Sequence, residues 1–176
     1  MLDINIYIVG ELAIKNEIEP YSLNVTTNPN YATHVLVGLD RMFTYEKLNE
    51  AIKAVHNGAK IVVTNPDPFY PVPEGYIADT LAIAKAIEVA SGSSISEVIG
   101  KPSKYYADQI HEKLNIPKNR CLIIGDRLET DIMLGKQHGF PTCLVLTGVT
   151  DRTLAEENNI KPDYIVDDLT SLIQLL

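Results

Sequence analysis

The sequence predicts an α/β protein built on parallel strands. Short apolar runs bounded by turn residues alternate with segments whose apolar residues recur at helical spacing, which is typical of parallel strands joined by crossover helices. The chain has 176 residues, 45% of them hydrophobic, and a chain of this size buries a core without disulfides or a structural metal. We expect one ordinary domain or two smaller ones.

Eight apolar runs are predicted as strands because turn residues bound each of them and the segments between them have helical periodicity. In chain order they are Asn5–Val9, Leu23–Thr26, His34–Val37, Lys60–Val63, Glu97–Ile99, Cys121–Ile124, Thr142–Leu146 and Tyr164–Val166.

Helical periodicity is clearest after Thr44, a candidate N-cap, where apolar residues recur from Tyr45 to Val55 before Asn57-Gly58 ends the segment. The other predicted helices are Asp79–Ala90, Lys104–Leu114, Thr130–His138, Thr153–Asn158 and a C-terminal turn from Leu169. Between them, residues 91–96 are small and polar, as connectors between compact units often are. We place a domain boundary there.

Composition excludes several classes of function. The net charge of −8 argues against a surface that neutralises nucleic acid phosphates. Cys121 and Cys143 lie inside apolar runs, where a thiol behaves as a small buried hydrophobe. Residues 1–5 contain no basic region before an apolar stretch, and every apolar run ends before membrane-spanning length. We expect a soluble, cytoplasmic protein that does not bind nucleic acid or membranes.

The strongest chemical signal follows the strand Cys121–Ile124, which runs directly into the sequence GDRLETD before helical periodicity resumes. Ligands of parallel α/β sheets bind at the carboxyl ends of the strands, so we expect Asp126 to point into that crevice and Asp131 to face the same point. Two carboxylates with no nearby His or Cys favour Mg²⁺. An alternative stays open, in which Thr130 caps the helix and the acids favour its positive end.

A second signal is Lys101, in the turn Gly100-Lys101-Pro102-Ser103 after the strand Glu97–Ile99. Pro102 sets the backbone of the turn and Ser103 can cap the following helix. Lys101 would then project into the same crevice, where an ammonium neutralises phosphate oxygens. A lone lysine is more often a solvated surface charge, but its position after a strand and before the Gly-Asp motif favours the phosphate interpretation.

These motifs recur with others in a fixed order. They are VGLDRMFTYEKL at 37–48, TNPDP at 64–68, GKPS at 100–103, GDRLETDI at 125–132, LTGVT at 146–150 and PDYIVDDL at 162–169. Together they resemble the haloacid dehalogenase (HAD) superfamily, and more narrowly its para-nitrophenyl phosphatase and NagD-type branch. The resemblance spans nearly the whole chain.

The resemblance implies a Mg²⁺-dependent phosphatase of small phosphorylated metabolites, with a Rossmann-like core and an inserted α/β cap. Residues 1–95 correspond to the cap, and residues 96–176 to the C-terminal half of the core.

For individual residues, the resemblance implies that Lys101 neutralises phosphate, Asp126 binds the metal and Asp131 supports the metal site beside it. It also implies that Asn65 and Asp67 lie on the cap loop that faces the substrate, although Asn-Pro-Asp-Pro equally fits an ordinary turn.

The sequence departs from the family pattern at the nucleophile. Family members carry Asp-x-Asp after the first core strand, where one Asp attacks phosphorus and the other acts as acid and base. No Asp-x-Asp occurs in these 176 residues, and the nearest approaches, Asp3-x-Asn5 and Asn65-x-Asp67, lack the strand or lie in the cap. Because the sequence begins where a cap begins, we expect little or no phosphatase activity from this chain alone. We also expect a homodimer, or another chain, to cover the edge of the strand Cys121–Ile124.

Three interpretations remain open. The chain is a binding or regulatory module without a nucleophile, a phosphatase completed by a partner chain, or an N-terminally truncated form of a longer enzyme. A dinucleotide-binding or flavodoxin-like module ranks lower, because no G-x-G-x-x-G follows a predicted strand. The four histidines lack metal-ligand spacing and are predicted to be structural or at the surface.

Overall fold

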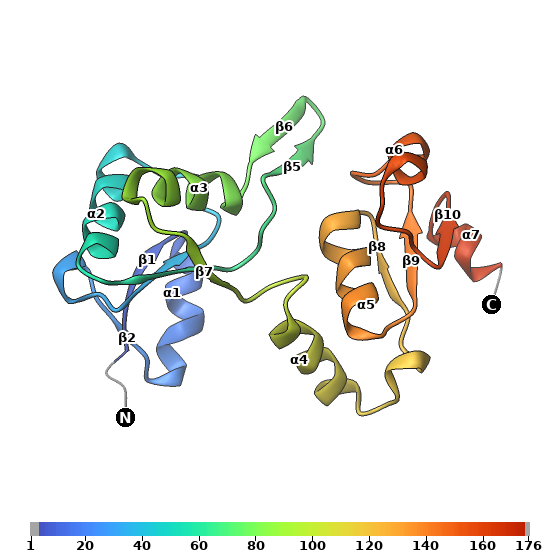
Figure 1. The fold of residues 1–176 in the computed structure, drawn as a ribbon, viewed down its shortest axis with the longest axis horizontal. Coiled ribbons are helices and arrows are strands. Elements are labelled where there is room, and N and C mark those ends of the chain that lie inside the picture. The colour runs from blue at the N-terminus through green and yellow to red at the C-terminus, as the bar shows by residue number, and fades with distance from the viewer. Residues whose placement is uncertain (1–3, 175–176) are drawn as a thin grey trace. The chain divides into compact units, whose positions relative to one another are not determined.

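The computed structural model describes residues 4–174, and the chain divides into two compact units, residues 1–99 and 100–176 (Figure 1). Both units contain parallel strands joined by helices, so the predicted α/β class is confirmed. The division follows Ile99 because the last strand before it pairs within the first unit. Residues 1–3, which include Asp3 of the Asp3-x-Asn5 approach and part of the N-terminal stretch without a basic region, lie outside the described part.

The first unit holds a five-stranded parallel sheet in the order β2-β1-β3-β4-β7. Its strands are β1 (Asn5–Val9), β2 (Asn24–Val25), β3 (His34–Val37), β4 (Lys60–Val63) and β7 (Ile95–Val98). The predicted bounds of β1, β3 and β4 are confirmed. The predicted bounds of β2 and β7 were wrong: β2 keeps only two residues, and β7 begins two residues earlier than predicted.

Two helices cover one face of this sheet, α2 (Tyr45–His56) and α3 (Thr80–Ser91), which pack against each other (Figure 1). Alternate strand residues point to one face of a sheet, and here they form a core with the apolar sides of both helices. That core includes Val9, Val35, Val37, Ile61, Val63, Ala51, Ala54, Ile83, Ala84 and Ile87. As predicted, Thr44 caps α2 by accepting a hydrogen bond from the Lys47 N–H at 3.2 Å.

Helix α1 (Leu12–Ile18) was not predicted, because none of its residues is buried and Glu11, at its N-cap, makes no side-chain capping bond. It is held by Ile14, whose side chain lies over Gly10 and Gly38. A Cβ at either glycine would overlap Ile14 Cδ1. Short 3-10 turns follow at Glu19–Tyr21 and Pro29–Tyr31.

A two-stranded antiparallel hairpin, β5 (Phe69–Val72) and β6 (Gly75–Ala78), precedes α3 and was also missed (Figure 1). Pro71 lies within β5, and proline in an apolar run argues against a strand. The hairpin rings of Phe69 and Tyr76 meet edge to face, with centroids 4.8 Å apart.

The second unit holds a three-stranded parallel sheet in the order β10-β9-β8. Its strands are β8 (Ile123–Gly125), β9 (Thr142–Val145) and β10 (Tyr164–Val166), and its helices are α4 (Lys104–Leu114), α5 (Met133–His138), α6 (Arg152–Glu157) and α7 (Leu169–Ile173). A 3-10 turn at Lys118–Arg120 precedes β8. Both faces of β9 are buried: Leu144 packs with the helical turn after β8 and with α6, while Cys143 and Val145 pack with α7.

The predicted helix Thr130–His138 begins differently in the structure. A π-helical turn, η4 (Leu128–Ile132), leads into α5, and Thr130 lies buried inside that turn, so its interpretation as an N-cap was wrong. Cys121 and Cys143 are free and buried, as predicted. Within residues 4–174, no helix is both long and apolar enough to cross a membrane.

Candidate functional site

Two loops meet the same edge of the second unit's sheet. Strand β8 ends at Gly125 and the parallel strand β9 ends at Val145, with Gly125 opposite Leu144 in the register. Because carboxyl ends of parallel strands share an edge, the loop that starts at Asp126 lies beside the loop of residues 146–150.

Asp126 is fixed by the loop that follows β9. Its carboxylate Oδ2 accepts a hydrogen bond from the Val149 N–H at 2.8 Å, and its main-chain oxygen accepts one from the Thr150 N–H at 3.1 Å. Gly148 passes so close that a Cβ there would overlap Asp126 Oδ2. The side chain is thus held through one oxygen.

Asp131 folds back from η4 onto the end of β8. It is 6% exposed, and its Oδ2 accepts the Arg127 N–H at 3.2 Å. Its carboxyl group lies against Gly125, where a Cβ would overlap it. The glycine in the Gly-Asp motif therefore makes room for the second aspartate of the same motif.

Lys101, near the start of the second unit, pairs with this aspartate. Its Nζ lies 2.6 Å from Asp131 Oδ1, in an ion pair whose aspartate side chain is nearly buried. The Lys101 turn is fixed on both sides: Ser103 caps α4 by accepting the Tyr106 N–H at 3.2 Å, and His138 Nε2 donates to Pro102 O at 2.9 Å. His138 therefore has a structural role.

These contacts decide which carboxylate fits a metal ion. Both oxygens of Asp131 accept hydrogen bonds, from Lys101 and Arg127, whereas among residues 4–174 the side chain of Asp126 accepts one only at Oδ2. Within residues 4–174, no group of three or more His, Cys, Asp or Glu side chains is placed to hold a metal. Mg²⁺ is commonly held by one or two carboxylates plus water and substrate phosphate, and Asp126 fits that mode.

Asn65 and Asp67 lie in the first unit, after β4, and bond to each other. Asn65 Nδ2 donates to Asp67 Oδ2 at 3.1 Å and to Asp79 Oδ2 at 3.4 Å, while Asp79 caps α3 through the Thr80 N–H. The pair therefore shapes the loop between β4 and the start of α3. Its predicted contact with substrate stays a prediction.

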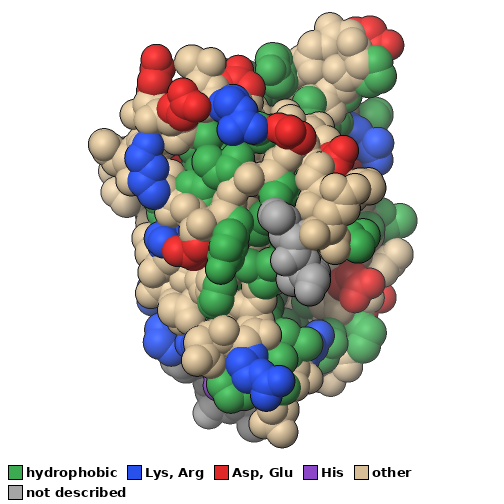
Figure 2. Space-filling view, turned by 90° about the vertical axis from the view of Figure 1, so that its right-hand side faces the viewer, with side chains coloured by type: hydrophobic (Ala, Val, Ile, Leu, Met, Phe, Trp, Pro, Cys, Tyr) green, Lys and Arg blue, Asp and Glu red, His purple; other side chains and the backbone are tan. Residues whose placement is uncertain are grey.

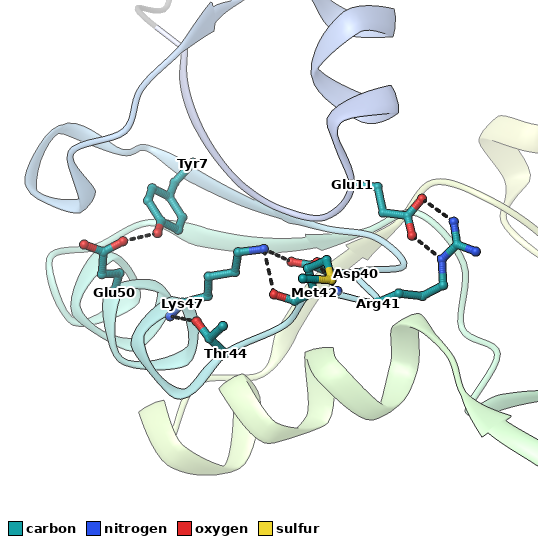
Figure 3. Close-up of polar contacts among 8 residues, drawn as sticks. All are labelled: Tyr7, Glu11, Asp40, Arg41, Met42, Thr44, Lys47 and Glu50. Atoms are coloured by element: carbon teal, nitrogen blue, oxygen red, sulfur yellow. Dashed lines mark hydrogen bonds and ion pairs between the residues drawn. The ribbon is translucent and has the colours of Figure 1, made fainter.

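Figure 3 shows three separate sets of polar contacts in the first unit, two of them beyond the carboxyl ends of β1 and β3. Arg41 donates to both oxygens of Glu11, at 2.5 and 3.1 Å, and Lys47 donates to Asp40 Oδ2 at 2.6 Å. The Tyr7 hydroxyl donates to Glu50; burial, followed by this bond, raises the pKa of Tyr7. A hollow of about 430 Å³ opens beside Glu11, Asp40 and Arg41.

A hollow of about 460 Å³ in the second unit lies away from Asp126. It is lined by residues that precede the strands, among them Pro141 before β9 and Asp163 before β10. Parallel strands bind ligands at the opposite end, so this hollow does not belong to the Asp126 site.

The chain is similar in sequence and in fold to known phosphatases. The HAD-hydrolase-like family model matches residues 98–172. The sugar phosphatase AraL of Bacillus subtilis is 31% identical over 170 residues, which are 97% of this chain and 62% of AraL. The p-nitrophenyl phosphatase from Archaeoglobus fulgidus superposes with a TM-score of 0.89 at 29% identity, over 99% of this chain and 68% of that chain.

This chain belongs to the haloacid dehalogenase superfamily. The similarity to p-nitrophenyl phosphatases confirms the NagD-type branch that the motifs predicted. A glycerol phosphate phosphatase from Mycobacterium tuberculosis, solved in complex with magnesium, superposes with a TM-score of 0.87 at 30% identity, over 97% of this chain and 52% of that chain. The chain spans somewhat less than two thirds of AraL's length.

The sequence interpretation missed one part of the site, the loop of Gly148, Val149 and Thr150. The stretch LTGVT follows the predicted strand Thr142–Leu146. The rule that parallel strands share a carboxyl edge, applied to that strand, would have placed the loop beside Asp126.

Proposed function

We propose that this chain carries the cation-binding and phosphate-binding part of a Mg²⁺-dependent phosphomonoester hydrolase for small phosphorylated metabolites. The observation that carries the proposal is the placement of Asp126, Asp131 and Lys101 at the carboxyl end of one sheet. There, Lys101 Nζ lies 2.6 Å from Asp131 Oδ1. Charge of both signs at such an edge suits a cation together with an anionic ligand.

Each residue has a distinct task in this proposal. Asp126 binds the cation through its carboxylate, and Asp131 holds Lys101 so that the ammonium charge stays at the strand edge. Lys101 neutralises phosphate oxygens. Bound Mg²⁺ supplies further positive charge to the phosphoryl group.

The substrate class is supported by the relatives. Their names describe a sugar phosphatase, a p-nitrophenyl phosphatase and a glycerol phosphate phosphatase. All three names denote the removal of phosphate from a small molecule, and we extend that class to this chain without choosing among its members.

The nucleophile limits what the 176-residue polypeptide does by itself. Covalent phosphoryl transfer in this family uses the first aspartate of Asp-x-Asp, and these residues contain no such pair. Positioned charge without the nucleophile keeps only a residual part of the rate enhancement. We therefore propose binding of Mg²⁺ and phosphate with little or no turnover, as in a binding or regulatory module.

Calorimetric titration with Mg²⁺ and with inorganic phosphate tests this proposal. Asp126→Asn should abolish measurable Mg²⁺ binding, and Lys101→Met should weaken phosphate binding by about tenfold, since an ion-to-phosphate bond is charge-assisted. Lys104→Met is the matched control, because Lys104 lies three residues away and pairs with Asp108 on α4. It should bind both ligands as the unchanged chain does.

If the unchanged chain binds neither Mg²⁺ nor inorganic phosphate, the proposed function is overturned. The absence of turnover is contradicted separately if repurified protein hydrolyses p-nitrophenyl phosphate with Mg²⁺ and Asp126→Asn loses that activity.

A further inference from the structure

The loop after β9 touches Asp126 at three points. The Val149 N–H donates to the carboxylate Oδ2, the Thr150 N–H donates to the main-chain oxygen, and Gly148 lies against the carboxylate itself. We name residues 148–150 the aspartate clamp. Thr150 is only 1% exposed, so the end of the clamp is anchored inside the unit.

Gly148 is needed for space and not for backbone conformation. Its φ does not lie in the left-handed region, where glycine is favoured, yet a Cβ would overlap Asp126 Oδ2 and approach Cγ at 2.5 Å. Alanine at this position therefore requires the carboxylate to move, because the carboxylate is the nearest group. A Cβ would also come within 2.6 Å of Asp126 Cβ, so Asp126 has to shift as a whole residue.

A carboxylate fixed through one oxygen presents the other in a defined direction. Outer groups that orient a metal ligand commonly contribute about 10- to 100-fold to metal affinity. The Val149 N–H of the clamp donates to Asp126 Oδ2, whereas Oδ1 accepts no hydrogen bond from residues 4–174.

We propose that the aspartate clamp is the positioning device of the cation site. It holds Asp126 Oδ2 so that Oδ1 meets a divalent cation, with Gly148 and the Val149 N–H as its positioning groups. This inference rests on the proposed function, since it assigns the cation to Asp126. It gives a role to Gly148 and Val149, for which the sequence motifs predicted none.

The test is calorimetry of Gly148→Ala with Mg²⁺ and, separately, with inorganic phosphate in the absence of Mg²⁺. We expect the Kd for Mg²⁺ to rise at least about tenfold while the Kd for phosphate stays unchanged, because the three heavy atoms nearest a Cβ at Gly148 all belong to Asp126. Thr147→Ala is the matched control: Thr147 is exposed and directly precedes the clamp without belonging to it, so both constants should stay unchanged.

The outcomes separate the two proposals. If the unchanged chain binds Mg²⁺, Asp126→Asn does not, and Gly148→Ala binds like the unchanged chain, the clamp is overturned and the cation site stands. Equal weakening by Thr147→Ala and Gly148→Ala also overturns the clamp. If Gly148→Ala loses phosphate binding together with Mg²⁺ binding, the substitution has unfolded the site and the positioning role is rejected. An unchanged chain that binds no Mg²⁺ overturns both proposals.

Discussion

Asp40 is a carboxylate buried at the end of β3, 4% exposed, and one lysine supplies its opposite charge (Figure 3). Its Oδ1 accepts the Met42 N–H at 3.0 Å and its Oδ2 accepts Lys47 Nζ at 2.6 Å. A buried charge that loses its partner keeps its desolvation cost. The pair therefore contributes more than its single hydrogen bond suggests.

Lys47→Met should lower the free energy of unfolding by about 2 kcal/mol, because it leaves the Asp40 carboxylate buried without a cation. Urea unfolding measures this change. The control is Arg41→Ala, beside Asp40 in the sequence, which removes an exposed ion pair with Glu11 and should leave stability unchanged within error. Equal losses in the two variants would contradict the assignment.

For Thr150 we expect a substitution to raise the free energy of unfolding. Its Oγ1 is buried and receives no hydrogen bond from residues 4–174. An unsatisfied buried hydroxyl is costly, so Thr150→Val, which keeps the shape, should raise the free energy of unfolding by about 1 kcal/mol. A thermal melt that shows a loss of stability would mean that the hydroxyl has a partner in solution.

The starts of β9 and β10 are tied together by Asp163. Its Oδ2 accepts both the N–H and the hydroxyl of Thr142 at 2.8 Å, and its Oδ1 accepts Lys136 Nζ at 2.7 Å. The hydrogen bond from Lys136, followed by that from Thr142, lowers the pKa of Asp163. The folded state therefore binds a proton at Asp163 less readily than the unfolded state does.

A lowered folded pKa adds stability above the unfolded value of about 3.9 and loses it as the pH falls through the folded value. The unchanged chain should accordingly lose more unfolding free energy between pH 5 and pH 3 than Asp163→Asn, because other carboxylates titrate alike in both proteins. Urea unfolding across that range measures the difference. Parallel pH profiles would contradict the role of Asp163.

Elements whose signal is local were predicted well, and elements fixed by distant contacts were not. The apolar runs of β1, β3 and β4 gave their bounds directly, since burial between helices favours such runs. Helix α1 has no buried residue of its own and depends on the contact of Ile14 with Gly38, 24 positions along the chain, as well as with the nearby Gly10. Hairpin β5–β6 contains Pro71, and a proline inside an apolar run argues against a strand.

The candidate site shows the same division. Lys101, Asp126 and Asp131 were singled out because turn and strand signals surround them. The π-helical turn that carries Asp131 has no local signal of this kind, and it replaced the expected cap at Thr130. The aspartate clamp was missed because its contacts join residues more than 20 positions apart.

Each of the two units has its own core, and Lys101, Asp126 and Asp131 belong to the second. Within the described residues, β8 is an edge of that unit's sheet, and its Ile124 is 42% exposed. The opposite edge is β10, whose Tyr164 and Ile165 are also exposed, as are Leu154 of α6 and Leu169 and Ile173 of α7. Figure 2 shows hydrophobic side chains at the surface among charged ones. An open apolar edge favours pairing with another strand.

We propose that a second copy of this chain covers the β8 edge. Sedimentation at micromolar concentration should show a dimer, and Ile124→Lys should dissociate it, because edge lysines block strand pairing. Ile165→Lys is the matched control on the other edge strand and should stay dimeric. A monomeric unchanged chain, or a dimer broken only by Ile165→Lys, would contradict this proposal.

The π-helical turn η4 makes the site sensitive to chain length as well as to residue type. A π turn holds one residue more than an α-helical turn, and one residue corresponds to about 100° of rotation around a helix. After deletion of the exposed Glu129, the helix cannot keep both of its contacts. Either Asp131 turns away from Lys101, or Leu134 and the rest of α5 leave their core. A single-residue deletion at this turn would thus be more damaging than most substitutions of the residue that is lost.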